Sequence, residues 1–337
     1  MLRFAGLSLV PLLLLALASP AGAGPKEKEP RPIAVTDPAQ AGPDFAIQGE
    51  YVGTAPYEGK DLKKELKYGV QIVALGGGKF HGVGYHGGLP GDGWDKKTKL
   101  EADGEIKDGV VVFKRKDSTS TYKDGAVTIV DRDGKTLCIF HKVQRTSPTL
   151  GAKPPAGAVV LFDGTSADKF SDGRTTPDGL LMEGATTKQS FQSYAIHLEF
   201  CIPFEPTKRG QGRGNSGYYA QGRYEVQILD SFGLAAKDNE CGAIYGVKAP
   251  EITMSFPPLS WQTYDVDFTA AQYKDGKKTQ NARLTVRHNG VEVLKDVEAP
   301  HATTAAPFPE GPNPSPIYLQ NHGNPVRFRN IWLVEKK

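Results

Sequence analysis

Apolar and polar residues alternate along most of the chain, in short runs separated by turn-forming residues. Between residues 45 and 146, runs such as "YGVQIVAL" and "LCIFHKV" are broken by Asp-Gly pairs at 103–104, 108–109, 124–125 and 133–134. Asp-Gly readily adopts positive φ and is typical of tight hairpins. The pattern predicts a small antiparallel β-domain over 45–146, with "DLKKELKY" at 61–68 as a short helix candidate.

The same alternation continues from residue 159 to 337, for example in "SYAIHLEFCIPF", "YEVQILDS" and "WQTYDVDFTA". Many strands with almost no helical periodicity predict an all-β protein whose second domain is a jelly-roll β-sandwich. "SPTLGAKPPAGA" at 147–158 is the predicted linker, because its adjacent prolines cannot donate hydrogen bonds to a sheet.

The first residues have the pattern of a signal peptide over 1–23. Arg3 is followed by an apolar run at 7–17 and by small residues at 21–23, so cleavage is predicted before Gly24. Residues 24–44 are Pro-rich and charged, which favours a flexible lead-in. No later segment approaches ~20 apolar residues. We expect a secreted or periplasmic protein with no integral membrane segment in its mature form.

Composition and charge limit the classes of binding partner that we expect. The formal net charge is only +3, which argues against nucleic acid as a partner. The chain has three cysteines, Cys138, Cys201 and Cys241, so at least one is unpaired. Cys201 and Cys241 either form a disulfide or are buried free thiols, and no cysteine has zinc-site spacing.

The strand "YEVQILD" has the chemistry of a candidate site. Glu225 and Gln227 share its polar face, and Asp230 joins them only if a β-bulge intervenes. The spacing resembles the Glu-x-Asp-x-x-Glu signature of laminarinase-like glycoside hydrolases, with an amide in place of the middle carboxylate. The alternative interpretation is a polar strand that faces solvent.

Two neighbouring strands have related patterns. In "NSGYYAQG", Asn215 precedes Tyr218 and Tyr219, which either stack on a sugar ring or pack in the core. In "YAIHLEF", His197 and Glu199 lie opposite the core-facing residues and form either a solvated face or a functional one.

The segment "QNHGNPVRFRNI" at 320–331 places Gln320 and His322 on one face before a turn. Arg327 and Arg329 then share a face of the next strand, while its apolar residues Val326 and Phe328 point to the core. Two adjacent strands would thus present amide, imidazole and guanidinium groups together. At least one arginine is expected to pair with a carboxylate such as Glu199.

These motifs together carry a family resemblance. "LFDGTSADKF", "GNSGYY", "YEVQILDS", "CGAIYGVKAP" and "YLQNHGNPVRFRNIWL" occur in an order and spacing similar to the 3-keto-disaccharide hydrolase domain family, over about residues 159–335. This bacterial family, abundant in planctomycetes and Bacteroidetes, has a concanavalin-like jelly roll, which agrees with the strand pattern.

The resemblance implies cleavage of glycosides whose C3 hydroxyl has been oxidised to a ketone. The ketone acidifies the C2 proton, so a base can remove it, the enolate can expel the C1 substituent, and water can add back. The resemblance implies an oligosaccharide or glycoside partner and requires no cofactor, although a divalent cation could hold the enolate. The candidate roles are base for His322 or Glu225, enolate stabiliser for Arg329, acid or metal ligand for Asp230, and sugar binding for Asn215, Tyr218, Gln227, Tyr245 and Gln320.

Two other functions stay open from sequence: a non-catalytic carbohydrate-binding module on the same sandwich, and a structural or adhesion domain. The sequence leaves the aglycone, the anomeric preference, the hydrolase or lyase outcome and the role of residues 45–146 undecided.

Overall fold

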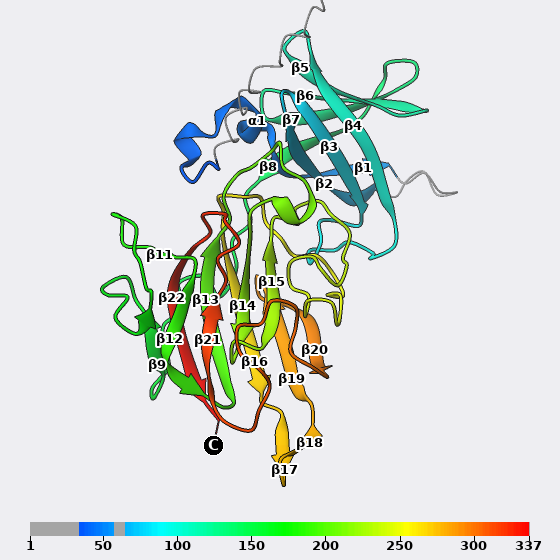
Figure 1. Ribbon diagram of the computed structural model, residues 1–337. Helices are drawn as coiled ribbons and strands as arrows, with labels where there is room; N and C mark the ends of the chain where they lie inside the picture. Colours follow the sequence, from blue (N-terminus) through cyan, green and yellow to red (C-terminus); the bar gives the residue numbers. More distant parts are fainter. Residues whose placement is uncertain (1–33, 57–64, 337) are drawn as a thin grey trace, which may run out of the picture. The chain divides into compact units, whose positions relative to one another are not determined.

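The computed structural model describes residues 34–56 and 65–336 (Figure 1). The signal peptide, its cleavage site, residues 24–33 of the lead-in and residues 61–64 of the helix candidate lie outside this part. The lead-in residues that are described hold the 3-10 helix η1 (Pro38–Gln40) and the start of α1 (Gly42–Ile47), and Val35 bridges Phe204. Within the described ranges, no helix has the length and apolar character needed to cross a membrane.

The first half of the chain is a closed barrel in which eight antiparallel strands pair in sequence order. The helix prediction for 61–68 is wrong at Glu65 to Tyr68, which open the second strand. Tyr51, Phe80 and Phe140 fill the interior, each no more than 2% exposed. The strands are β1 (Gly49–Pro56), β2 (Glu65–Gly76), β3 (Lys79–His86), β4 (Lys99–Lys107), β5 (Val110–Lys114), β6 (Ser118–Lys123), β7 (Ala126–Asp131) and β8 (Thr136–Val143).

Three of the four Asp-Gly pairs lie in turns of this barrel. Asp108 and Asp124 have φ of 51° and 49°, and each opens a two-residue hairpin with the glycine that follows. The third pair, 133–134, lies between β7 and β8. The prediction is wrong for 103–104, because Gly104 lies inside β4, where a Cβ would come within 2.5 Å of the Phe113 ring. Close packing, and not a turn, requires this glycine.

The second half is a sandwich of two antiparallel sheets, which confirms the all-β jelly-roll prediction. The smaller sheet has the order β10-β12-β21-β14-β15, and the larger has the order β11-β22-β13-β16-β19-β20, with β9 added beside β22. A two-stranded ribbon, β17-β18, completes it. The strands are β9 (Val159–Phe162), β10 (Phe170–Ser171), β11 (Leu181–Met182), β12 (Ala185–Phe191), β13 (Tyr194–Cys201), β14 (Asn215–Ala220), β15 (Tyr224–Leu229), β16 (Trp261–Thr269), β17 (Gln272–Lys274), β18 (Lys277–Gln280), β19 (Ala282–His288), β20 (Val291–Ala299), β21 (Ser315–Leu319) and β22 (Arg327–Glu335), and a 3-10 turn, η2 (Gly210–Gly212), precedes β14.

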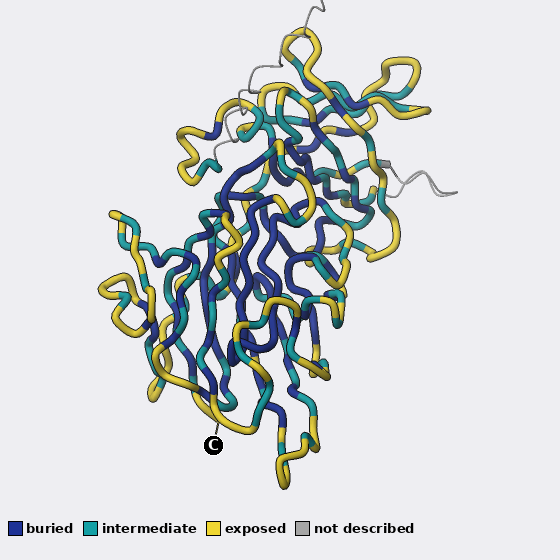
Figure 2. Tube along the Cα trace, in the orientation of Figure 1, coloured by how far each residue is buried: buried dark blue, intermediate teal, exposed yellow. Residues whose placement is uncertain are grey.

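Side chains that alternate along these strands form the sandwich core. Leu198 of β13, Val226 of β15 and Phe328 of β22 are all completely buried, as the sequence pattern predicts. Figure 2 shows long buried stretches along the sandwich strands and exposed residues at many of the turns.

The segment 320–326 crosses from one sheet to the other. β21 belongs to the smaller sheet and β22 to the larger one, so the two strands are not neighbours as the sequence analysis expected. Alternation within β22 was predicted correctly, with Val326 and Phe328 in the core. Arg327 and Arg329 therefore project from the outer face of the larger sheet, away from Gln320.

All three cysteines are free. Cys201 has the same parity on β13 as His197 and Glu199, which point away from the core, whereas Cys241 is part of the core. The two thiols therefore lie on opposite sides of a sheet layer, and the Cys201–Cys241 disulfide left open by the sequence is not formed.

The predicted linker packs on the outer face of the larger sheet. The backbone N–H of Gly151 donates to Glu199 Oε1 at 2.6 Å, and Asn330 and Trp332 both donate to the carbonyl oxygen of Ala152, at 3.0 and 3.2 Å. His197 stacks on Trp332 with ring centroids 5.1 Å apart. The polar face of β13 is therefore covered by chain and is not the solvated face that the sequence allowed.

Charge holds this covered face together. His197 Nδ1 lies 2.7 Å from Asp265 Oδ1, and Arg329 Nε donates to Glu199 Oε2 at 2.7 Å. Burial opposes the charge on His197, but hydrogen bonds to Asp265 and Glu199 outweigh it and raise the pKa of His197 to about 9. Burial likewise opposes the charge on Glu199, but hydrogen bonds from His197, Asn330 and Arg329 lower its pKa to about 2. Both groups are charged at neutral pH.

Candidate functional site

A polar pocket of about 120 Å³ opens on the face of the smaller sheet that is turned away from the core. The three strands that supply its floor, β14, β15 and β21, run side by side (Figure 1). Six of the nine site residues predicted from sequence lie in this pocket. The lining residues are Gln211, Asn215, Tyr219, Glu225, Gln227, Tyr245, Thr304, Ala305, Gln320 and His322.

The register of the β14–β15 hairpin explains the arrangement of the floor. Tyr219 pairs with Glu225, and Gly217 pairs with Gln227. Residues directly opposite each other point to the same face, so Tyr219 and Glu225 stand together there. β21 continues the floor, because the backbone N–H of Gln320 donates to the Gly217 carbonyl oxygen at 2.9 Å.

Among the residues that the structure describes, Glu225 is the only carboxylic acid that lines the pocket, and it is 3% exposed. Burial raises its pKa to about 8, although a hydrogen bond from Tyr219 opposes the rise. No lysine or arginine in the described part of the chain forms an ion pair with it. Glu225 is therefore mainly a neutral acid at pH 7, able to donate a proton.

Gly217 makes room for this acid. A Cβ at position 217 would collide with Glu225 Oε1 and would lie 2.8 Å from the Tyr219 ring. Any larger residue would push the carboxyl group or the ring out of position.

Four amide side chains line the pocket with Glu225: those of Gln211, Asn215, Gln227 and Gln320. Asn215 and Gln227 are each 1% exposed, and both donate to Gln211 Oε1, at 3.2 and 2.9 Å. Gln320 Nε2 donates to the Tyr219 hydroxyl at 3.1 Å. These bonds fix the amides against one another before any ligand arrives.

Loops form the rim. The segment around Tyr245 adds to the edge of β15, with the Tyr245 N–H donating to the Glu225 carbonyl oxygen at 3.1 Å. On another side, Thr303 Oγ1 accepts from the Glu225 N–H at 2.9 Å and brings exposed Thr304 and Ala305 to the rim. His322 is exposed and enters from the segment that crosses between the sheets. The pocket thus has a buried acid in its floor and an accessible imidazole at its rim.

Asp230 lies outside the pocket. The bulge that would have turned it toward Glu225 is absent, since the β14–β15 register is regular from Asn215 to Leu229. β15 ends at Leu229, and the Asp230 carboxylate accepts from Arg213 Nε at 2.9 Å in a buried ion pair. We therefore assign Asp230 a structural role, bracing the loop before β14.

Tyr218 and Arg329 also lie elsewhere. Tyr218 points into the sandwich core, where its hydroxyl donates to the Tyr194 hydroxyl at 3.0 Å. Arg329 lies on the opposite sheet, stacked 4.0 Å over the Trp261 ring and paired with Glu199. The expected arginine–Glu199 pair is thus confirmed, while a position for Arg329 in the pocket is wrong.

Four lining residues were not assigned to the site from sequence. Tyr219 was named as either a sugar-stacking or a core residue, and alternation places it on the same face as Asn215, four residues before it. Gln211, Thr304 and Ala305 come from loops, whose return to the sheet no periodicity reveals.

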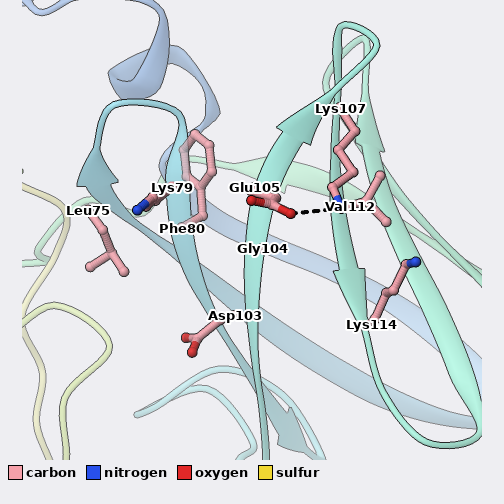
Figure 3. A pocket seen from close by; sticks show the side chains of 9 residues that line it. All are labelled: Leu75, Lys79, Phe80, Asp103, Gly104, Glu105, Lys107, Val112 and Lys114. Atoms are coloured by element: carbon pink, nitrogen blue, oxygen red, sulfur yellow. Dashed lines mark ion pairs between the residues drawn. The ribbon is translucent and has the colours of Figure 1, made fainter.

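The other pockets described here do not bring several of the predicted site residues together. The outer surface of the barrel has a groove of about 340 Å³ that is lined mainly by exposed charged side chains, including an ion pair of Lys107 and Glu105 at 2.8 Å (Figure 3). The barrel interior has an apolar cavity of about 90 Å³. Within the described residues, no group of three or more His, Cys, Asp and Glu side chains is arranged to hold a metal ion.

Comparisons with known proteins concern the second half of the chain. A family model for 3-keto-α-glucoside-1,2-lyase-like domains matches residues 157–334. A solved structure from Parabacteroides distasonis, described as a candidate glycosyl hydrolase, is 31% identical with a TM-score of 0.50, covering 54% of this chain and 85% of that one. Another structure with that description, from the same organism, is 18% identical with a TM-score of 0.39, covering 54% of this chain and 94% of that one. A search of curated proteins finds no match.

Proposed function

Because the chain belongs to the family of 3-keto-α-glucoside-1,2-lyase-like domains and is thereby a carbohydrate-active protein, we propose that it cleaves 3-keto-glycosides in the Glu225 pocket. The substrate class includes 3-keto-disaccharides. The observation that carries the proposal is a buried, neutral carboxylic acid and an accessible imidazole facing one small polar pocket.

The chemistry requires two proton transfers before water enters. A base takes the proton from C2, and the electrons of that C–H bond move to the C3 carbonyl oxygen as an enolate. The enolate then re-forms the C3 ketone, a C1–C2 double bond forms, and the C1–O bond breaks, with an acid protonating the leaving oxygen. Addition of water, hydroxyl to C1 and proton to C2, completes a net hydrolysis.

We assign the acid role to Glu225 and the base role to His322. Glu225 holds a proton at pH 7 because it is buried without a counter-charge. His322 is exposed at the rim and can exchange protons with solvent. The Tyr219 hydroxyl donates to the backbone carbonyl oxygen of Thr304 at 3.1 Å, so it would have to turn from that bond to stabilise the enolate oxygen, a role that Arg329 cannot take from the opposite sheet.

The number of carboxylic acids argues against an ordinary glycosidase mechanism. Retaining and inverting glycosidases normally use two carboxyl groups on either side of the scissile bond. Glu225 is the single carboxylic acid that residues 34–56 and 65–336 contribute to the lining of this pocket. A C3 ketone removes the need for the second group, because the substrate itself stabilises the negative charge. The same observation supports a second candidate, a binding module without catalysis.

Incubation with a 3-keto-disaccharide and with its unoxidised parent separates these functions. We expect release of free 3-keto-sugar from the first substrate only, with kcat reduced about 10²- to 10⁴-fold in both Glu225→Gln and His322→Ala. His301→Ala, another exposed histidine outside the pocket, is the matched control. Binding without turnover supports the binding module instead, and full turnover by both pocket variants contradicts the assigned roles.

A further inference from the structure

Gln211, in the turn η2 before β14, determines which atoms the pocket presents. Its Nε2 donates to the backbone carbonyl oxygen of Asn239 at 2.8 Å. A carbonyl oxygen can only accept, so this bond fixes the direction of the Gln211 amide, and Gln211 Oε1 is left as an acceptor.

That single oxygen then sets the orientation of two more amides. It accepts from Gln227 Nε2 at 2.9 Å and from Asn215 Nδ2 at 3.2 Å, and the Gln211 carbonyl oxygen accepts a second bond from Asn215 Nδ2 at 2.9 Å. With both amide nitrogens engaged on Gln211, the oxygens of Asn215 and Gln227 must point the other way.

These two oxygens have no protein donor within the part of the chain that the structure describes. Asn215 Oδ1 and Gln227 Oε1 are both buried, and both side chains line the pocket. Gln320 Oε1 is in the same condition on the neighbouring strand. A buried acceptor without a donor destabilises the folded protein, because it has lost its hydrogen bonds to water. A ligand that donates hydrogen bonds to these atoms would remove that destabilisation.

We infer that Gln211 is a positioning residue, whose amide turns Asn215 and Gln227 into a pair of acceptors selecting sugar rings with free hydroxyl donors. The inference rests on the proposed function for the ligand class, a glycoside. At about 120 Å³ the pocket is smaller than the ~300–1,000 Å³ typical of drug-sized ligands and fits about one sugar ring. Sites built to hydrogen-bond a hydroxyl reject analogues that lack it.

Fluorine replacement tests the inference, because a C–F group keeps the approximate size of a hydroxyl but cannot donate. The probes are methyl α-3-ketoglucoside and its 2-, 4- and 6-deoxyfluoro analogues, titrated by calorimetry. All proteins carry His322→Ala, so that the sugar is not consumed. We expect one or two analogues to bind roughly tenfold to hundredfold more weakly than the parent sugar.

Two variants of Gln211 then distinguish an effect on the orientation of the neighbouring amides from an effect on the shape of the pocket. Gln211→Leu removes the acceptor of Gln227 Nε2 and should bring the affinity ratio toward one for the analogue that Gln227 discriminates, while Asn215 keeps its bond to the backbone carbonyl oxygen of residue 211. Gln211→Glu still accepts from both amides and should retain the discrimination. Melting temperatures of both variants verify that they fold. Residue 211 is half-buried in a surface turn, so the fold should tolerate both substitutions.

The outcomes distinguish this inference from the proposed function. Three results would overturn the orienting role of Gln211: equal affinity for all four sugars, equal loss of discrimination in both Gln211 variants, or no binding at all. Turnover by the unmodified protein would still support the lyase chemistry in each case. Conversely, Gln211-dependent discrimination without turnover by the unmodified protein leaves the positioning role intact and rejects the chemistry.

Discussion

At the scale of single residues, the environment of Glu225 determines what the pocket can do. Asp230 is buried to a similar degree but pairs with Arg213, whereas Glu225 has only uncharged neighbours in the floor. Removal from water without a counter-charge favours the neutral form of a carboxyl group. Two acids five residues apart therefore have different roles, one catalytic in our proposal and the other structural.

The first prediction concerns pH. If neutral Glu225 supplies the proton to the leaving oxygen, kcat/KM for a 3-keto-glycoside should fall as pH rises through about 8, where the folded protein loses that proton. Glu225→Gln cannot titrate, so its residual activity should lack this alkaline decline. A wild-type profile that rises through the same interval would mean that Glu225 acts as a base.

The second prediction concerns Gly217. Gly217→Ala should lower kcat/KM by tenfold or more, because the added methyl displaces the Glu225 carboxyl group or the Tyr219 ring. Gly311→Ala is the matched control, since its Cβ would meet nothing closer than Arg223 Nη2 at 3.8 Å. Steady-state kinetics and thermal melting together separate a misplaced acid from an unfolded protein.

At the scale of elements, alternation predicted which face each side chain occupies more reliably than which strands are neighbours. Val326 and Phe328 were placed in the core correctly, but β21 and β22 were taken as one hairpin. A strand's faces depend on its own residues, whereas sheet membership depends on where the chain travels after a turn. The misplacement of Arg329 followed from that difference.

The linker on the larger sheet is a second case in which the sequence pattern did not predict a contact between distant parts of the chain. Its prolines and glycines predicted a free connection, yet residues 151 and 152 bond to Glu199, Asn330 and Trp332. Those bonds use backbone atoms of the linker, which every sequence possesses. The polar residues on β13 and β22 were the one sequence feature consistent with a segment packing over this face.

The third prediction follows from the pKa of His197, which the fold raises from about 6.5 to about 9. The charged form therefore contributes stability that is fully present below about pH 6.5 and is lost as pH rises through about 9. The wild-type advantage over His197→Gln in free energy of unfolding should shrink across this interval, by at most about 3 kcal/mol. Urea unfolding at several pH values measures it.

Glu199 determines how the stability of the same network changes at low pH. Because its pKa is lowered to about 2, its contribution is present above about pH 4.5 and disappears as pH falls toward 2. His301→Gln, at an exposed site, is the control for the histidine variant. A constant difference between wild type and His197→Gln from pH 6 to 9 would show that folding does not raise the pKa of the histidine.

At the scale of the whole molecule, the all-β strand content follows from the sequence pattern, while the site depends on long-range folding. β14 and β15 are a local hairpin, and their residues Asn215, Glu225 and Gln227 were found in advance. Gln320 and His322 enter from about 100 residues further along the chain, by a route that local periodicity does not encode. Those two residues were named from the polar pattern of 320–331, and the family resemblance supplied their roles.

The fourth prediction is that the molecule depends on no disulfide. Denatured protein should show three reactive thiols per chain, and a reductant should leave the melting temperature unchanged. In the native state the thiols should react slowly, because burial raises the pKa of each to about 11 or 12. Fewer than three thiols in freshly denatured, unreduced protein would reveal a covalent bridge.

The segment that crosses between the sheets also couples ligand binding to the cohesion of the sandwich. Glu225 belongs to one sheet, and His322 lies on the chain that leaves it for the other, so a sugar contacting both would resist separation of the two layers. By mass action, ligand at a hundred times its Kd adds about 2.7 kcal/mol to the free energy of unfolding. Sugar occupancy would thereby regulate how long the folded protein survives proteases and heat.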